Sequence, residues 1–159
     1  MEDLLIVIIR WLHVLSGVMW IGLLWYFNFV QIPSMPKIPD DQKPAIGKVI
    51  APEALFWFRW SALSTVVFGL ILAMMNGYLV DALTLNNALI GFGMWLGLIM
   101  AFNVWFVIWP NQQKALGMVE VEADAKAKAA RTAMLFSRTN TMLSVPMLFA
   151  MVAAQNMTL

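Results

Sequence analysis

The only histidine of the chain, His13, has the side chain with the broadest chemistry in an almost entirely apolar stretch, RWLHVLSGVMWIGLLWYFNFVQ. A neutral imidazole can bind haem iron, carry a proton, or hydrogen-bond to a neighbouring helix as a packed polar group. The spacing alone leaves these three roles open. Gly17, one helical turn below His13, leaves space either for a flat macrocycle or for close helix contact.

A haem bound by His13 would be of the b type, and its second axial ligand cannot be another histidine of the same chain. The last apolar segment supplies methionines instead, namely Met142, Met147 and Met151. A His13 from a second subunit or an open coordination position would also complete the site. We therefore regard His13 as the candidate metal ligand, with Gly17, Met147 and Met151 as the helix-borne residues beside it.

Two arginines, Arg59 and Arg138, are candidate anion ligands. Aromatic residues surround the first (FWFRW), while hydroxyl and amide groups surround the second (FSRTNT). A guanidinium in this setting can bind haem propionates, a purine anion or a lipid phosphate, or can simply snorkel to the headgroups. Together with Asn103 and Asn140 they form the substrate or anion-binding set that we predict. No catalytic residue is identified.

The composition shows what kind of fold must position these groups. The chain is 62% hydrophobic and 12% charged, whereas a soluble domain is about half apolar and about a quarter charged. The net charge of +1 gives no electrostatic case for binding nucleic acid. The absence of cysteine excludes disulfides, thiolate metal sites and covalently attached haem within this sequence.

Four apolar segments are long enough to cross a bilayer, at residues 4–30, 52–76, 85–109 and 133–154. Prolines should interrupt the helices after the first and third segments and kink the fourth at Pro146. The polar stretch 112–132 predicts a cytoplasmic helical extension. All lysines and arginines except Arg10 lie in or beside the first and third loops. By the positive-inside rule these loops face the cytoplasm and both termini face the outer, periplasmic side.

The predicted fold is therefore a single all-α membrane domain, a bundle of four transmembrane helices in the bacterial inner membrane. Four blocks of its sequence also resemble a known family: RWLHVLSGVMWIGLLWYFNFVQIP, FWFRWSALSTVVFG, MAFNVWFVIWPNQ and FSRTNTMLSVPMLFAM. They are similar, in this order, to the membrane-embedded N-terminal domain of the bacterial urate hydroxylases, or membrane urate oxidases. The general plan is also similar to haem-binding membrane proteins of the protoporphyrinogen-oxidase and copper-resistance type.

The resemblance implies an oxidoreductase connected with urate oxidation in purine breakdown, in which this chain corresponds to the membrane part without the cytochrome c domain. It carries over the following residues: Arg10, Trp11, His13, Trp20, Asn28, Gln31, Phe58, Arg59, Trp60, Asn103, Pro110, Asn111, Ser137, Arg138, Asn140, Ser144 and Pro146.

Three hypotheses about function follow. The first is a haem b electron-transfer module that works with a cytochrome c or respiratory-complex partner. The second is a non-catalytic subunit whose role is assembly or contact with the lipid bilayer, within a larger membrane complex or a homo-oligomer. The third is a pathway for purine-like anions.

Overall fold

The computed structural model describes residues 2–157, and all secondary structure within this range is helical. The elements are α1 Glu2–Trp25, η1 Tyr26–Gln31, α2 Ile32–Ser34, η2 Met35–Lys37, α3 Lys43–Ala45, η3 Ile46–Ile50, α4 Ala51–Met75, α5 Leu79–Leu83, α6 Ala88–Phe102, η4 Asn103–Ile108, α7 Trp109–Ala115 and α8 Ala123–Asn156.

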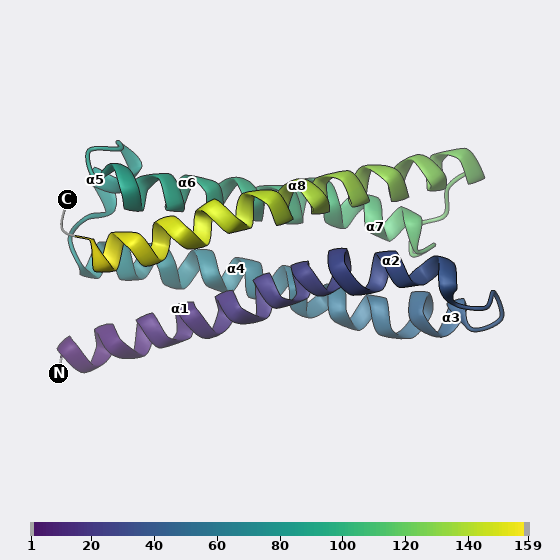
Figure 1. Ribbon diagram of the computed structural model, residues 1–159, viewed down its shortest axis with the longest axis horizontal. Helices are drawn as coiled ribbons and strands as arrows, with labels where there is room; N and C mark the ends of the chain where they lie inside the picture. The colour runs from purple at the N-terminus through teal and green to yellow at the C-terminus, as the bar shows by residue number, and fades with distance from the viewer. Residues whose placement is uncertain (1, 158–159) are drawn as a thin grey trace.

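These elements join into four long rods that run up and down in a bundle (Figure 1). α1 packs along α4, and α8 packs along α6 and α7, while α4 also touches α6. The start of α1 and the end of α8 lie at one end of the bundle, which we call the terminal end. The opposite end, which we call the loop end, holds α2, α3 and the connection between α7 and α8 (Figure 1).

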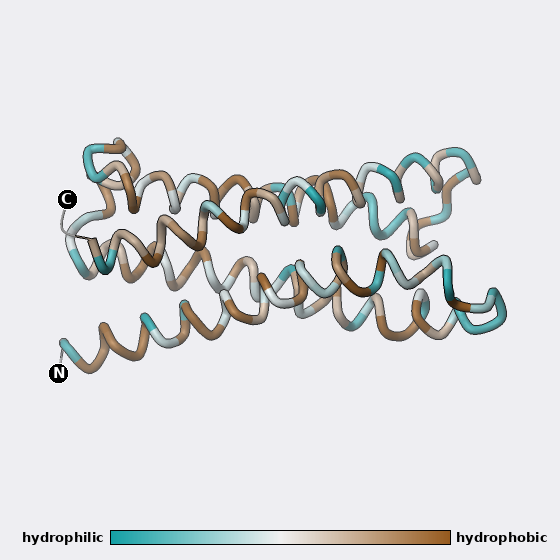
Figure 2. Tube along the Cα trace, viewed as in Figure 1, coloured by the Kyte–Doolittle hydropathy of each residue, from teal (hydrophilic) through white to brown (hydrophobic). Residues whose placement is uncertain are grey.

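Three continuous helices, Asp3–Lys37, Lys43–Met75 and Ala88–Ala115, are long and apolar enough to cross a membrane. This property indicates an integral membrane protein. The hydrophobic residues dominate the middle of the bundle, and hydrophilic residues gather at the loop end (Figure 2). α8 is not among the three, because its opening turns are charged and residues 137–141 are polar.

Each of the three π-helical segments is followed by a proline: η1 by Pro33, η3 by Pro52 and η4 by Pro110. Proline lacks the backbone N–H, and its ring clashes with the carbonyl four residues earlier. The wider turn of a π-helix relieves this conflict, because its hydrogen bonds run from i to i+5. The rods therefore pass through Pro33 and Pro110, at which the sequence predicts interruptions, and the second rod begins at Lys43, before the start near Pro52 that the sequence predicts.

The observed ends of the rods differ from the predicted ends at several places. The first rod continues to Lys37 and stops where Ile38 turns extended (ψ 131°) before Pro39. The third continues past Pro110 to Ala115. The predicted extension over 112–132 is divided, because a turn at Gly117, with φ at +74°, separates α7 from α8. α8 itself continues through Pro146.

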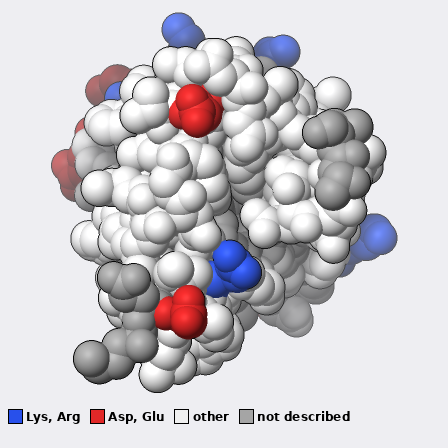
Figure 3. Space-filling view, turned by 90° about the vertical axis from the view of Figure 1, so that its left-hand side faces the viewer, with Lys and Arg blue, Asp and Glu red and all other residues white. Residues whose placement is uncertain are grey.

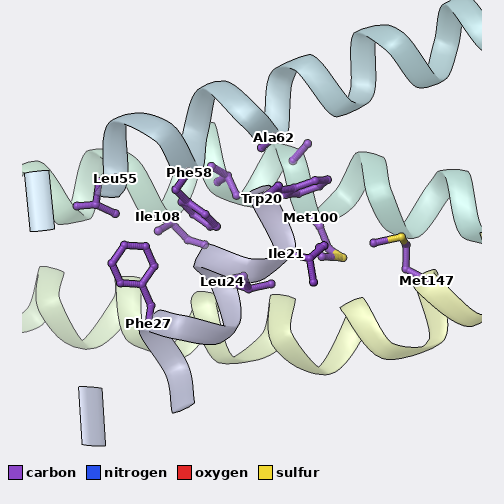
Figure 4. Packing of buried hydrophobic residues seen from close by; sticks show 12 residues of the cluster. Trp20, Ile21, Leu24, Phe27, Leu55, Phe58, Ala62, Met100, Ile108 and Met147 are labelled. Atoms are coloured by element: carbon purple, nitrogen blue, oxygen red, sulfur yellow. The ribbon is translucent and has the colours of Figure 1, made fainter. Parts of the chain in front are cut away.

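The hydrophobic core fills the middle of the bundle (Figure 4). Trp20 and Leu24 of α1 are 1% and 0% exposed, and they belong to one cluster with Phe58 of α4, Met100 of α6 and Ile108 of η4. Between this core and the terminal end, Gly17, Gly69 and Gly97 line space that side chains do not fill.

Candidate functional site

A cavity of about 680 Å³ occupies the terminal half of the bundle between α1, α4, α6 and α8. Figure 3 views the terminal end, where the surface is mostly uncharged and is hollowed beside a basic group. The volume falls within the range of about 300–1,000 Å³ that is usual for small-molecule and cofactor sites. The walls are largely apolar, with side chains such as Val14, Val18, Ile21, Leu70, Leu98 and Leu148.

His13 lies on one wall of this cavity, and its orientation is fixed by α4. Its Nδ1 lies 2.8 Å from the backbone carbonyl oxygen of Thr65. Because a carbonyl can only accept, Nδ1 must carry the hydrogen and donate it. In the neutral imidazole this leaves Nε2 with its lone pair, which is the arrangement that metal-ligating histidines commonly have.

Gly69 makes the contact between His13 and α4 geometrically feasible. A Cβ atom at position 69 would lie 2.8 Å from Cε1 and 3.0 Å from Nδ1 of His13. Any larger residue would therefore push the imidazole away from the Thr65 carbonyl. Gly17 also lines the cavity, and a Cβ there would make only an ordinary contact, 3.8 Å from Thr65 Cγ2.

Thioethers line the same cavity from the side of α8. Met147 is 6% exposed, and Met151 packs against α6, where a Cβ at Gly93 would lie 3.3 Å from its Cε. Met94 of α6 contributes a third sulfur to the lining. The structure thus brings four of the six predicted cofactor-site residues, His13, Gly17, Met147 and Met151, to one cavity.

The other two predicted residues, Arg59 and Arg138, do not line the cavity. The guanidinium carbon of Arg59 lies 3.8 Å from the ring centroid of Trp109 and 5.4 Å from that of Phe56, a cation–π arrangement. Arg138 is exposed on α8. The arginine that does line the cavity is Arg10, which our prediction of the anion set did not include.

The predicted anion-binding asparagines form a packed pair instead of an open site. Asn103 Nδ2 donates to Asn140 Oδ1 at 2.9 Å, and Asn140 Nδ2 donates to the Met100 carbonyl at 2.9 Å. Both side chains are buried, with Asn140 fully covered. Hydrogen bonds from Asn28 to Ser137 (2.8 Å) and from Trp25 to Ser144 (2.9 Å) similarly join α1 and η1 to α8. These polar groups hold the helices together.

Besides Arg10, sequence reasoning did not single out Thr65, Gly69 and Tyr78, which also line the cavity. Thr65 acts through its backbone, so its residue type carries no signal. Gly69 sits four residues after Thr65, the spacing of one helical turn, but only the pairing of α1 with α4 relates either residue to His13. Among the described side chains of residues 3–157, no group of three or more His, Cys, Asp or Glu is placed to hold a metal ion.

Comparison with known proteins shows the family to which this chain belongs. A family model described as the urate oxidase N-terminal domain matches residues 71–158, which is 88 of the 159 residues. The match includes Asn103, Asn140, Met147 and Met151, while His13 precedes it. No curated protein and no solved structure matches the chain. As the family model covers more than half of its length, the chain belongs to the urate oxidase N-terminal family.

Proposed function

We propose that this chain is the membrane redox module of a urate hydroxylase-like system and that it binds a b-type haem through Nε2 of His13. The observation that carries the proposal is the tautomer and position of His13. Its Nδ1–H donates to the Thr65 carbonyl, and the ring borders a large apolar cavity. A carbonyl acceptor of this kind holds a metal-binding imidazole in one tautomer and one orientation.

The residues around the cavity fit a haem in size and chemistry. The walls offer apolar side chains to a flat macrocycle, and Gly17 adds no bulk beside His13. His13 together with Met147 or Met151 would hold the iron, a His/Met pair being a usual ligand set that raises the reduction potential. When bound, the haem would supply one-electron transfer. The protein would hold it and exclude bulk water by the core around Trp20.

The membrane arrangement that we propose has four spans, with α8 as the fourth, in the bacterial inner membrane. The loop end carries Lys37, Lys43, Lys48, Lys114, Lys126, Lys128 and Arg131, so the positive-inside rule supports a cytoplasmic loop end. The cavity then lies in the periplasmic half of the bilayer. A periplasmic cytochrome c or another respiratory partner could approach it from that side.

The two other hypotheses have less support from the geometry. An anion pathway would need free carboxamides, whereas Asn103 and Asn140 are buried and bonded to each other. A purely structural subunit, or a homo-oligomer without a cofactor, would account for the hydrogen bond from His13 to Thr65 and for the contact at Gly69, but it gives no role to the cavity that the imidazole borders.

The test is the visible spectrum of the purified protein in mild detergent, oxidised and dithionite-reduced. The protein should be expressed with haem available and purified with a tag that contains no histidine. We expect a Soret band and α/β bands that sharpen on reduction, lost in His13→Ala but kept in Arg59→Gln, which lies outside the cavity. A colourless wild-type protein would refute the haem assignment and favour the structural role.

A further inference from the structure

We propose that Arg10 and Tyr78 form a carboxylate-binding subsite at the mouth of the cavity, which holds the acidic groups of the bound macrocycle and directs them towards the terminal end. This inference rests on the proposed function, because it concerns the orientation of the same ligand.

Arg10 lies on the correct side of His13 for this role. It precedes His13 by three residues on α1, so the two side chains are neighbours on one helix face, with Cβ atoms about 5–6 Å apart. Both line the cavity, and Arg10 is the one nearer the terminal end. A ligand held at His13 would therefore extend its edge towards the guanidinium.

Tyr78 reaches the same mouth from a different element, the connection between α4 and α5. Burial raises the pKa of its phenol, and the positive charge of Arg10 opposes this rise. The phenol is thus a neutral O–H donor at physiological pH. Gln155 and Asn156 at the end of α8 add amides to this rim.

The charges of the described residues support a ligand for Arg10. Among the side chains that the structure describes, those of residues 3–157, the only ion pair joins Lys43 and Asp40 at the loop end. Arg10 is therefore a cation at the edge of a largely apolar cavity, inside a helix long enough to span the membrane. Charged residues in such helices usually face a functional partner. Arg59 differs, because its guanidinium lies on Trp109.

The shared chemistry is an anionic oxygen group, and lipid phosphates of the outer leaflet could also supply it. Two probes separate these sources. Protohaem has two carboxylates, and its dimethyl ester has the same macrocycle without the charges. We would titrate each into the detergent-solubilised, haem-free protein and follow the Soret band for wild type, Arg10→Gln, Tyr78→Phe and the matched control Arg59→Gln.

We expect wild type and Arg59→Gln to bind the free acid about tenfold more tightly than the ester, as for a charge-assisted hydrogen bond. Arg10→Gln should bind both equally, Tyr78→Phe should show a smaller preference, and Arg10→Lys should restore part of it. Equal binding of acid and ester by wild type, dependent on His13, would overturn the subsite while leaving the proposed function intact. Binding of neither would overturn both. Circular dichroism confirms that each variant retains its helices.

Discussion

The substitution Gly69→Ala tests the geometry on which the site depends. The added Cβ would lie 2.8 Å from Cε1 and 3.0 Å from Nδ1 of His13, whereas carbon atoms in contact are about 3.5–4.0 Å apart. The imidazole or α4 must therefore move by roughly 0.5–1 Å. A shift of that size would stretch the 2.8 Å hydrogen bond to the Thr65 carbonyl beyond the usual limit of about 3.2 Å.

Two destabilising effects and one stabilising effect decide the change in the free energy of unfolding. Overpacking a filled contact costs about 1–3 kcal/mol, and losing the hydrogen bond adds about 1 kcal/mol. Replacing a helical glycine by alanine gains about 0.5–1 kcal/mol. We therefore expect Gly69→Ala to lower the free energy of unfolding by about 1–3.5 kcal/mol.

The matched control is Gly97→Ala. Gly97 is also helical and lines the same cavity, but a Cβ there would meet nothing within 4 Å. Only the gain in helix propensity applies, so this variant should be neutral or more stable by up to about 1 kcal/mol.

The assay combines a stability measurement with a direct view of the imidazole. Unfolding is followed by circular dichroism as SDS is added to the protein in mild detergent. As His13 is the only histidine, ¹⁵N-histidine labelling gives NMR signals from this site alone. Wild type should show the Nδ1–H tautomer, and Gly69→Ala should lose it. If both variants were equally stable and both retained that tautomer, the reasoning about Gly69 would be refuted.

Three further predictions concern other parts of the molecule. Asn140→Leu should lower the free energy of unfolding by about 1–3 kcal/mol in the same SDS assay. The double variant Asn103→Leu/Asn140→Leu should lose less than the sum of the two single variants, because the two side chains bond each other. Strict additivity would contradict this. At the loop end, the hydrogen bond and charge of Lys43 hold the pKa of Asp40 below its usual value, so Lys43→Met should raise the carboxylate midpoint measured by NMR. Any stability from this pair is present at neutral pH and is lost only as pH falls through the lowered pKa, and an unchanged midpoint would count against the bond. In a Tyr26→Phe background, where Tyr78 is the remaining tyrosine, its phenol should titrate above its usual pKa when followed by ultraviolet absorbance. Arg10→Gln should raise that pKa further, because it removes the positive charge that lowers it. A lower pKa in Arg10→Gln would contradict the interaction.

Local properties of the sequence were sufficient for the general architecture. The apolar segments predicted helices of membrane-spanning length, and three of the observed rods have that character. The rod ends were less predictable, because Pro33 and Pro110 were interpreted as interruptions. The π-helical turns before these prolines relieve the clash. A proline alone does not predict such a turn, since Pro146 lies inside an α-helix.

The candidate site shows a similar division. Helical periodicity placed His13 and Gly17 on one inward face, and the last apolar segment supplied Met147 and Met151; the structure brings these four residues to one cavity, whereas Met142 is exposed. The same reasoning selected Arg59 and Arg138 by their neighbours in sequence, whereas Arg10 is the arginine at the cavity. The difference arises because an arginine near a helix end has several environments available, and only the packing of helices selects one.

The sequence by itself determined the apolar helices, the family and the histidine with its small neighbour, because composition, motifs and periodicity are properties of single segments. Only the tertiary structure decided which nitrogen of His13 carries the hydrogen, why residue 69 is glycine, and which cation borders the cavity. Each of these depends on groups that the bundle brings together from distant positions, as Thr65 is brought to His13 across 52 residues.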